Sequence, residues 1–538
     1  MKLLKPSKQS LRDPAERRSA RFLTEETMPK EAIKDLALSL LKLKNPTRDK
    51  VELIKLKWSA KYHSKIPLNS SLLEAVSGKD KENLAAMLRT KPTRTLSGVS
   101  TIAIMTKPMG CPGRCIYCPS SKIAAKSYTG FEPSAMRARL NNYDSYKIVK
   151  NRLEQLQAVG HSTAKNEVII QGGTFTALPW KYQYNFIKRA FDAFNNKTAK
   201  TLEKAQELNE TSPNRVVSLI IETRPDFCRQ EHINKMLQLG ATRVELGLQS
   251  VYDNVLKIIC RGHDLNEAKR AIKELKDAGF KVDLHVMLGL PGSTKKKDIE
   301  MFRILFEDED LRPDGLKIYP TAVLPNTKLF DMWKSGKYNP TNEKYIIDVL
   351  TEAKAKYIPP YVRIKRIMRD IPSTKISAGY ERLNLREIIQ NKLYESGKPC
   401  RCIRCREIGQ KYKNEGKLPK TIQLKLIEYD ASGGKEFFIS YEDNEQDILL
   451  GFARLRITTN KAFLRELHVY GESVPLEKSI KSASQHKGLG KSLLKEAEKL
   501  AKENNIKELF VLSGVGVRDY YRKLGYTGKG FYMSKKLA

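Results

Sequence analysis

A chain of 538 residues is too long for a single hydrophobic core, so we expect three or four domains. Hydrophobic residues make up 40% of the sequence, which favours a largely globular protein over a disordered one. The 98 Lys and Arg residues exceed the 61 Asp and Glu residues by 37, an excess that repels itself in a compact fold and that a free-standing metabolic enzyme does not need.

The positive charge favours a polyanionic partner, because each neutralised phosphate releases condensed counterions. A Lys-rich surface of the thermophilic kind is the structural alternative, but such surfaces usually balance Lys with Glu. Nucleic acid is therefore the expected partner, and an anionic membrane surface is the second possibility.

Several features indicate a cytoplasmic protein without a membrane segment. The first ten residues, MKLLKPSKQS, lack the apolar core of a signal peptide, and no run of about 18 apolar residues predicts a membrane span. Six of the eight cysteines fall in two tight clusters, a pattern typical of metal binding in a reducing compartment.

Residues 1–95 are basic and mostly helical in pattern, with 22 Lys and Arg residues against 11 Asp and Glu residues. In a predicted helix over 31–44, Ile33, Leu36, Leu40 and Leu41 share one face. Basic side chains interleaved with aromatic ones suit RNA phosphates and stacked bases. A solvated charged face fits this stretch equally well, but the charge of the whole chain favours RNA. These side chains are Arg17, Arg18, Arg21, Lys55, Lys57, Trp58, Lys61 and Tyr62.

From about Val99, apolar strands alternate with helical stretches such as 266–278 and 298–306. This alternation predicts parallel βα units around a barrel over residues 96–371. Six units would leave the barrel incomplete, with an open side that could admit a large substrate. The expected strands are 101–105, 168–171, 216–222, 243–249, 282–288 and 316–319.

A Cys-bearing linker over 372–418 precedes a final segment, 419–538, with a mixed α/β pattern. One strong helix is expected at 488–502. The predicted fold is thus a multidomain α/β protein: a basic helical N-terminal region, a partial (βα)6 barrel, and a mixed α/β domain. The strands expected in the last segment are 422–429, 437–441, 448–457, 463–470 and 509–512.

Cys111, Cys115 and Cys118 directly follow the first expected barrel strand. Three thiolates on one loop can hold three irons of a [4Fe–4S] cluster and leave the fourth iron open. An open iron can bind S-adenosylmethionine (SAM), from which electron transfer releases a 5′-deoxyadenosyl radical. A zinc site is the alternative, but no further Cys or suitably spaced His follows closely. An aromatic residue just before the third Cys, here Tyr117, is a further resemblance to the cysteine loop of radical SAM proteins.

The ends of the expected barrel strands agree with this resemblance, because strand ends face the site in a barrel. Radical SAM proteins have a Gly-Gly segment that meets the SAM amino group, and here Gly172 and Gly173 end the second strand. Glu222 and Arg224 end the third strand and are expected to meet the SAM ribose and carboxylate, with a buried structural ion pair as an equal alternative. Gln249 ends the fourth strand.

Gln485, Gly488 and Gly490 form a Q-x-x-G-x-G motif before the strong C-terminal helix. It resembles the pyrophosphate loop of GCN5-related acetyltransferases (GNAT), in which backbone N–H groups and a helix N-terminus bind a diphosphate. The stretch that contains Tyr520 and Tyr521 resembles the late helix of that family, in which tyrosines lie near the thioester. Core packing explains one adjacent tyrosine but hardly both.

Cys400, Cys402 and Cys405 form the second cluster, in the linker. Thiolates so close together repel one another unless a cation holds them, so a structural zinc ion is expected. A second iron–sulfur cluster and free thiols are the less favoured alternatives.

Taken together, these residues resemble the catalytic, third subunit of Elongator in a stand-alone form, over nearly the whole chain. The stretches that carry the resemblance are 111–118, 127–137, 172–175, 316–320, 440–443, 466–471 and 485–490.

The resemblance implies that the chain installs a carboxymethyl group on C5 of the wobble uridine, U34, in the tRNA anticodon stem-loop. SAM cleavage would generate a radical that takes hydrogen from the methyl group of acetyl-CoA. The carbon radical would add to C5, and thioester hydrolysis would leave the carboxymethyl group.

The resemblance also implies a reductant protein as electron donor, and it leaves a homodimer open. Tyr520 and Tyr521 would be catalytic residues. The residues implied for acetyl-CoA are Lys165, Glu466, Leu467, His468, Val469, Gln485, Gly488, Leu489, Gly490, Lys491 and Tyr521.

Two other functions stay open at this point. A protein lysine acetyltransferase could use the barrel as a scaffold, although a scaffold needs no open iron. An RNA-binding regulator could sense SAM or acetyl-CoA without turnover, and release of 5′-deoxyadenosine would exclude it.

Charge reversal at Arg17, Arg18 and Arg21 is expected to weaken tRNA binding and flatten its salt dependence, because fewer counterions are released. The slope of log affinity against log salt should fall by about one per lost phosphate contact. Binding titrations at several salt concentrations measure both quantities. If neither changes, the N-terminal residues do not bind RNA.

Overall fold

The structure is a computed structural model that describes residues 27–44, 46–88, 97–471 and 488–537. Four residues of the expected sites, Arg17, Arg18, Arg21 and Gln485, lie outside the described residues. Internal contacts divide the chain into two units, of which the first combines the residues up to Thr93 with Leu153–Ser162. Each unit is described by itself.

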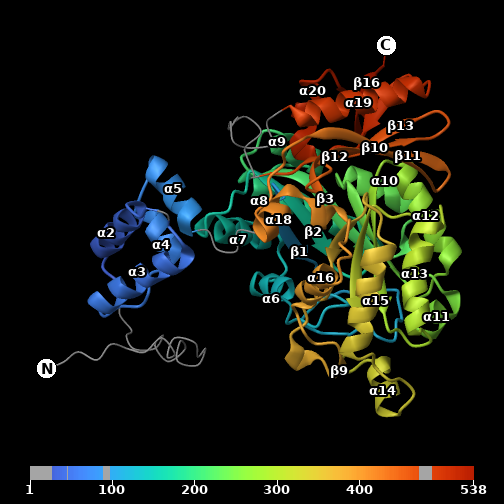
Figure 1. Cartoon of the computed structure of the whole chain (residues 1–538), viewed down its shortest axis with the longest axis horizontal. Helices are drawn as coiled ribbons and strands as arrows, with labels where there is room; N and C mark the ends of the chain where they lie inside the picture. Colours follow the sequence, from blue (N-terminus) through green and yellow to red (C-terminus); the bar gives the residue numbers. More distant parts are fainter. Residues whose placement is uncertain (1–26, 45, 89–96, 472–487, 538) are drawn as a thin grey trace. The chain divides into compact units, whose positions relative to one another are not determined.

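The first unit is a bundle of short helices, and it confirms the expected helical N-terminal region. Leu36 and Leu40, which share one face of α2, are fully buried together with Leu72 and Leu84. Polar side chains face away from this core, as the periodicity predicted. The helices are α2 (Lys30–Leu41), α3 (Arg48–Lys61), α4 (Asn69–Glu74) and α5 (Gly78–Leu88), in blue in Figure 1.

The second unit begins with a parallel sheet in the order β1-β2-β3-β4-β5-β6-β8, whose two edge strands, β1 and β8, leave the barrel open. The predicted partial barrel is confirmed, and the structure places all six expected strands. These are β1 (Ser100–Met105), β2 (Lys165–Gln171), β3 (Arg215–Thr223), β4 (Arg243–Gln249), β5 (Lys281–Leu288) and β6 (Gly315–Pro320).

Helices follow the strands in sequence, and α13 packs against α15 (Figure 1). They are α6 (Pro133–Leu140), α7 (Ser145–Ala158), α8 (Trp180–Asn195), α9 (Leu202–Asn209), α10 (Gln230–Gln238), α11 (Asp253–Ile258), α12 (Leu265–Asp277), α13 (Lys295–Glu307), α14 (Lys328–Lys334) and α15 (Glu343–Lys356). A two-stranded ribbon joins β7 (Ala322–Val323) to β9 (Ala378–Gly379).

The sheet contains a seventh strand that the sequence did not predict, because β8 (Arg363–Arg366) pairs with β6. Its four residues, RIKR, include three charges, so neither hydrophobicity nor alternation predicted it. Ion pairs stabilise it instead: Arg363 contacts Glu407 at 2.6 Å, and Lys365 contacts Asp283 at 2.8 Å.

The inside of this barrel carries charges, whereas barrels usually carry branched apolar residues there. Neighbouring members of one continuous series, the lumen chain, have nitrogen and oxygen atoms 3.7 Å or less apart. Buried charges are tolerated only when paired, and here each is paired. In order, the lumen chain consists of Glu222, Lys317, Glu245, Lys365, Asp283, Arg243 and Glu466.

The C-terminal part is a second sheet in the order β10-β11-β12-β13-β14-β16-β15, with α19 (Leu489–Glu503) packed on β11, β12 and β13. Its last two strands, β15 (Thr527–Lys529) and β16 (Tyr532–Lys536), were missed from the sequence because they are short and mostly polar. The expected mixed α/β domain is confirmed. The other strands are β10 (Gln423–Ala431), β11 (Gly434–Asp443), β12 (Ile448–Ile457), β13 (Ala462–Val469) and β14 (Glu508–Val511).

Three helices fill the segment between the two sheets: α16 (Leu385–Glu395), α17 (Ile403–Arg406) and α18 (Ile408–Glu415). The backbone N–H of Ile403 donates to the Val362 carbonyl beside β8 at 2.9 Å. Helix α18 contacts β12, and Glu407 forms a β-bridge with Leu449 of that strand. The segment therefore contacts both sheets.

Buried arginines join the second sheet to the barrel. Arg465 of β13 donates two parallel hydrogen bonds to Asp314, at 2.7 and 2.8 Å, and contacts Glu436 at 2.7 Å. These three residues are at most 3% exposed. Arg456 of β12 reaches Asp277 of α12 at 2.6 Å. Burial alone would raise the pKa of Asp314, but Arg465 and Arg454 hold it well below its usual range.

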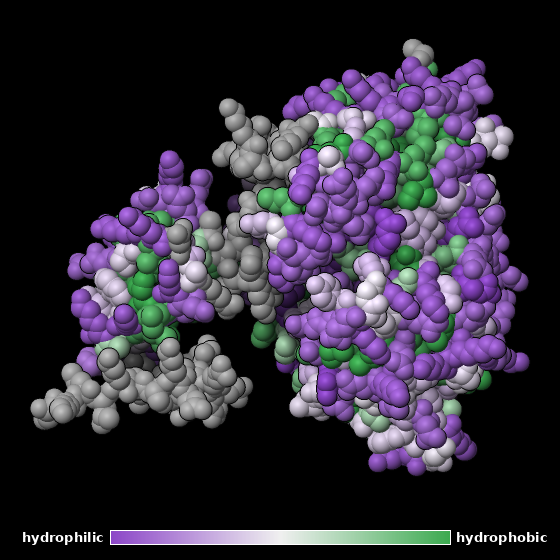
Figure 2. Space-filling view, in the orientation of Figure 1, coloured by the Kyte–Doolittle hydropathy of each residue, from purple (hydrophilic) through white to green (hydrophobic). Residues whose placement is uncertain are grey.

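No helix among the described residues combines the length and the apolar composition that a membrane span requires. Hydrophilic residues cover most of the face shown in Figure 2.

Replacing Arg465 with Met is expected to destabilise the protein by about 3–5 kcal/mol, because Asp314 and Glu436 would each lose their closest buried cation and keep only Arg454, at 3.5 Å, and Arg456, at 3.2 Å. Chemical denaturation followed by tryptophan fluorescence measures the change. Arg303→Met, which removes exposed pairs with Glu300 and Glu307, is the matched control and should change little. Equal effects of the two variants would contradict the role assigned to Arg465.

Candidate active site

The loop that carries Cys111, Cys115 and Cys118 follows β1 and is anchored on both sides. The Ile116 N–H donates to the Ile259 carbonyl at 3.1 Å, and the Ile116 carbonyl accepts from the Leu329 N–H at 3.0 Å. The buried guanidinium of Arg261 donates to Cys115 Sγ at 3.4 Å, which places a positive charge beside this thiol. Burial and the charge of Cys115 raise the pKa of Cys118 to about 11.

The spacing of these thiols is wider than that of sulfurs around a single zinc ion. Sulfurs around one tetrahedral zinc lie about 3.8 Å apart, because each Zn–S bond measures about 2.3 Å. Within the described part of the chain, Cys111, Cys115 and Cys118 do not form a group of ligand atoms within 4.8 Å of one another. Thiolates that bind three different irons lie further apart, so the spacing fits a cluster better than zinc.

A cavity lies beside this loop, at the carboxyl ends of the barrel strands. It brings together five of the six residues that the sequence assigned to SAM: Tyr117, Gly173, Glu222, Arg224 and Gln249. The sixth, Gly172, does not line the cavity.

Gly172 has a packing role instead, because a Cβ at this position would lie 2.4 Å from Thr106 Oγ1. Its neighbour Gly173, with φ +74°, adopts a conformation that side chains disfavour.

The guanidinium of Arg224 uses only some of its nitrogens in an ion pair. Its Nε and one terminal nitrogen donate to Asp226 at 2.9 and 2.6 Å, while the other, Nη1, is buried without a hydrogen-bond partner among the described residues. A Cβ on Gly113 of the cysteine loop would lie 1.9 Å from Nη1, so this nitrogen points toward the loop. An unpartnered guanidinium nitrogen beside a cavity fits a ligand carboxylate.

The cavity wall also contains side chains that sequence patterns did not indicate: Tyr128, Glu245 and His285. Lys317, which was not predicted either, contacts Glu245 of this wall. Tyr128 donates to Glu222 at 2.9 Å, and Lys317 pairs with both Glu222 and Glu245. A charged residue within an expected buried strand was the available signal. Glu222, Glu245 and His285 lie as close as metal ligands do, but the Lys317 ammonium already balances the two carboxylates.

A second cavity lies between the barrel and the C-terminal sheet. Strand β14 ends at Val511, opposite Leu464, so it does not pair with Glu466 to Val469 of β13. Lys165, Arg243 and Lys281, at the amino ends of barrel strands, form the opposite wall. Eight of the residues that the resemblance implied for acetyl-CoA or catalysis line this cavity: Lys165, Glu466, Leu467, His468, Val469, Gly490, Tyr520 and Tyr521.

Three other implied residues, Gly488, Leu489 and Lys491, lie beside Gly490 at the start of α19 but not in the cavity wall. Gly488, the N-cap residue, has φ +79° and no side chain of its own to cap the helix, which leaves room for an anion at the first N–H groups as far as the described residues go. A Cβ on Gly490 would lie 3.0 Å from the Tyr520 hydroxyl, which explains the Gly.

Positive charge dominates one wall of this second cavity. Burial lowers the pKa of Lys165 to about 8, with help from Arg215, and burial likewise lowers the pKa of Lys281 to about 8. Both amines therefore stay mostly protonated at neutral pH. Tyr521 is buried in the sheet core, and Tyr520 packs partly exposed against it, so one of the two tyrosines does have the core role.

The two cavities use opposite ends of the same strands. In β2, Lys165 lines the second cavity and Gln171 the first; in β4, Arg243 and Gln249 do the same. Six residue steps along a strand separate each pair by about 20 Å. The lumen chain connects the two walls, with Glu222 in the first and Glu466 in the second.

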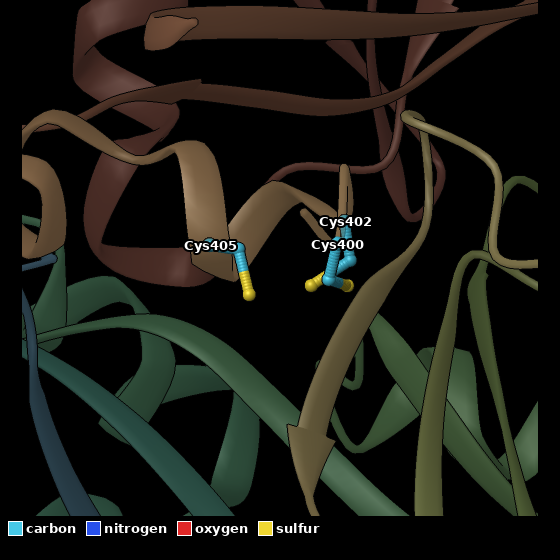
Figure 3. Close-up of side chains that lie close together, drawn as sticks. All are labelled: Cys400, Cys402 and Cys405. Carbon is cyan, nitrogen blue, oxygen red and sulfur yellow. The ribbon is translucent and has the colours of Figure 1, made fainter. Parts of the chain in front are cut away.

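The thiols of Cys400, Cys402 and Cys405 converge: their sulfurs lie within 4.8 Å of one another and point into one space (Figure 3). Cys400 and Cys402 are buried, and the Cys405 N–H donates to the Cys402 carbonyl at 3.0 Å. The ammonium of buried Lys354 lies 3.8 Å from Cys405 Sγ.

Comparisons with known proteins agree with this geometry. The Radical SAM superfamily model matches residues 106–305, and the Radical_SAM C-terminal domain model matches 313–395. The ELP3 N-terminal domain model matches residues 30–96, and the Acetyltransferase (GNAT) family model matches 396–526.

Several relatives align with most of the chain, from the barrel to the C-terminal sheet. A tRNA uridine(34) acetyltransferase of Methanocaldococcus infernus is 46% identical over 490 residues, which is 88% of this chain and 92% of the relative. The chain belongs to the tRNA uridine(34) acetyltransferase and Elongator complex protein 3 family. The human Elongator complex protein 3 is 39% identical, covering 90% of this chain and 92% of its own.

The solved structure of archaeal Methanocaldococcus infernus Elp3 with an N-terminus deletion (1-46) has a TM-score of 0.74 and 44% identity. The match covers 82% of this chain and 100% of that one.

The family implies a [4Fe–4S] cluster and SAM for the barrel and acetyl-CoA for the GNAT sheet. The residues present fit these groups. The spacing of the loop cysteines suits a cluster, Arg224 offers an unpartnered nitrogen to a carboxylate, and the uncapped start of α19 suits a diphosphate.

Proposed function

We propose that this chain carboxymethylates C5 of the wobble uridine, U34, of tRNA, with acetyl-CoA as the two-carbon donor and SAM as the radical source. The observation that carries the proposal is that the cleft suited to acetyl-CoA has walls from both catalytic parts: Lys165, Arg243 and Lys281 from the barrel, and the residues from Glu466 to Val469 from the GNAT sheet. A free-standing acetyltransferase would not need a barrel wall.

In the barrel, Cys111, Cys115 and Cys118 would hold three irons of the cluster. A bound cluster supplies the electron that cleaves SAM into methionine and a 5′-deoxyadenosyl radical. Arg224 would bind the SAM carboxylate through its unpartnered nitrogen. Tyr117, Gly173, Glu222 and Gln249 would enclose SAM, and Gly172 would keep the strand end close to Thr106.

In the GNAT sheet, Gly488, Leu489, Gly490 and Lys491 would bind the CoA diphosphate at the start of α19. Glu466, Leu467, His468 and Val469 would line the pantetheine and acetyl group, opposite Lys165. Gln485 belongs to the same proposed loop. Tyr520 and Tyr521 would contact the thioester, because both line the cleft.

The anticodon stem-loop is the proposed macromolecular substrate, and it accounts for the basic charge of the chain. U34 would leave its stack to enter the enzyme, while cations bind the flanking phosphates. In the first unit, Trp58 and Tyr62 stack with centroids 5.7 Å apart, and the Lys61 ammonium lies 5.3 Å from the Trp58 ring. Such a platform suits RNA bases, and Arg17, Arg18 and Arg21 are proposed to act with it.

The electron must come from a separate reductant protein, and abundant tRNA and reduced thiols fit the cytoplasm. We further propose that the parts expected from sequence act as separate functional segments: 1–95 for tRNA, 96–371 for radical chemistry, 372–418 for linkage and 419–538 for acetyl-CoA.

Anaerobically reconstituted protein with SAM, acetyl-CoA, bulk tRNA and a reductant is expected to form 5-carboxymethyluridine, measured by mass spectrometry of digested nucleosides. Cys115→Ala should abolish the product, because one iron ligand is lost, whereas Cys260→Ala, an exposed cysteine outside both clusters, should retain it. Deoxyadenosine without modified uridine would contradict the acceptor. Acetylation of a lysine peptide that survives Cys115→Ala but not Tyr521→Phe would favour the protein acetyltransferase.

We also propose a structural zinc ion at Cys400, Cys402 and Cys405. The convergence of the three sulfurs is typical of a single ion, in contrast to the wider spacing of the barrel cysteines. Lys354 would balance part of the thiolate charge from outside the ligand set. The ion would stabilise the segment with α16, α17 and α18, which contacts both sheets.

Elemental analysis is expected to find about one zinc per chain, lost in Cys402→Ser and kept in Cys228→Ser, which changes a buried cysteine elsewhere. Cys115→Ala should lose iron but keep zinc. Extra iron lost with Cys402→Ser would indicate a second cluster instead. Absence of both metals in the parent protein would indicate free thiols.

A further inference from the structure

The proposed reaction ends with hydrolysis of a thioester, which needs a group to take a proton from the attacking water. The thioester would lie in the acetyl-CoA cleft, so the base belongs among the titratable side chains of its walls. These are Lys165, Glu167, Arg243, Lys281, Glu466, His468, Tyr520 and Tyr521.

The two carboxylates are unsuited to this role. Glu466 accepts from Arg243 at 2.7 Å and from Arg454 at 3.0 Å. Burial alone would raise its pKa, but Arg243 and Lys281 hold that pKa well below its usual range. Glu167 pairs with Arg243 at 3.2 Å, and its pKa is lowered in the same way, against burial, by Lys365 and Arg243. Carboxylates so held are weak bases.

The other groups are acids at neutral pH. Burial raises the pKa of Tyr520 and of Tyr521, so both hydroxyls keep their protons. Lys165 and Lys281, each with a pKa of about 8, are mostly ammonium ions. They can stabilise a negative oxygen, and the neutral fraction that could accept a proton is only about a tenth at pH 7 and falls further as the pH is lowered.

His468 has the geometry of a base. Its Nε2 lies 3.0 Å from the Ser97 carbonyl oxygen, and because a carbonyl only accepts, Nε2 carries the hydrogen. Nδ1 therefore bears the lone pair of the neutral ring. Among the described residues Nδ1 has no hydrogen-bond partner, and it is not sealed from solvent. The ring stacks against Phe452 with an interplanar angle of 8°, which fixes its orientation.

We propose that His468 is the general base for thioester hydrolysis in the acetyl-CoA cleft, an assignment that rests on the proposed function. Nδ1 removes a proton from water as its oxygen bonds to the carbonyl carbon. The bond between carbon and sulfur then breaks, and the sulfur leaves as CoA thiolate, which takes the proton back from the imidazolium. The products are a carboxylic acid, which ionises, and CoA thiol.

Charged groups on several elements face His468. Glu466 shares its strand, Arg363 comes from β8, and Glu407 precedes α18. Burial lowers the pKa of His468 below its usual 6.5, and Arg363 lowers it further, while Glu466 and Glu407 oppose this change. The net lowering keeps the ring neutral at pH 7. Hydrolysis should therefore rise with pH in the acid range, with the midpoint of the rise below pH 6.5, because only the neutral ring accepts a proton.

The test follows release of CoA thiol from acetyl-CoA by the whole protein, with and without bulk tRNA, between pH 5 and 8. His468→Gln is expected to lower kcat by about 100- to 10,000-fold while KM for acetyl-CoA stays near that of the parent. The acid limb of the pH profile should disappear. Added imidazole should restore part of the rate of His468→Ala.

His232→Gln is the matched control, because His232 lies on α10 outside both cavities. Calorimetric binding of acetyl-CoA to each variant confirms that the cleft is intact. Three results would overturn the assignment: an acid limb that persists in His468→Gln, a change confined to KM, or no CoA release by the parent protein.

Failure of the His468 assignment and failure of the proposed carboxymethylation give different results. Hydrolysis of acetyl-CoA itself needs no radical, so it is expected to persist in Cys115→Ala. A His468-dependent hydrolysis without any modified uridine would then leave the base assigned and the acceptor wrong. Modified uridine that forms normally in His468→Gln would leave the proposed function standing and remove His468 from it.

Discussion

The paired hydrogen bonds between Arg465 and Asp314 set the relation between the two catalytic parts. Asp314 precedes β6, the sixth barrel strand, and Arg465 directly follows the last residue of β13 that pairs with β14. Two parallel donors on a buried carboxylate fix orientation as well as distance. Because this contact lies beside the acetyl-CoA cleft, the barrel wall and the GNAT wall of that cleft are held in one geometry.

This arrangement explains why the barrel has a site at each end of its strands. Radical chemistry occupies the usual position at the carboxyl ends, where the cysteine loop follows β1. The amino ends, which normally serve stability alone, here carry Lys165, Arg243 and Lys281, which line the second cavity, the cleft proposed for acetyl-CoA. The charges required at both ends continue through the interior, so an apolar barrel core is replaced by paired charges.

Sequence patterns predicted the alternating strands, the cysteine loop and the Gly motif of α19, because each depends on local spacing. They could not predict β8, whose RIKR residues are held by ion pairs with Glu407 and Asp283 from distant parts of the chain. The role of Gly172 was also beyond sequence reasoning, since it depends on the position of Thr106. Likewise, Lys317 and His285 gain their significance only from partners on neighbouring strands, and the hydrogen bond from His468 to Ser97 spans 371 positions.

The lumen chain has a consequence for how this family can change over time. Apolar barrel cores accept many combinations of Val, Ile and Leu as long as volume is kept. A series of seven alternating charges accepts no such exchange, because loss of one member leaves its neighbours buried and unbalanced. Its two ends lie in the walls of the two cavities, at Glu222 and Glu466. A substitution in the wall of one cavity is thereby expected to disturb the charge balance as far as the wall of the other.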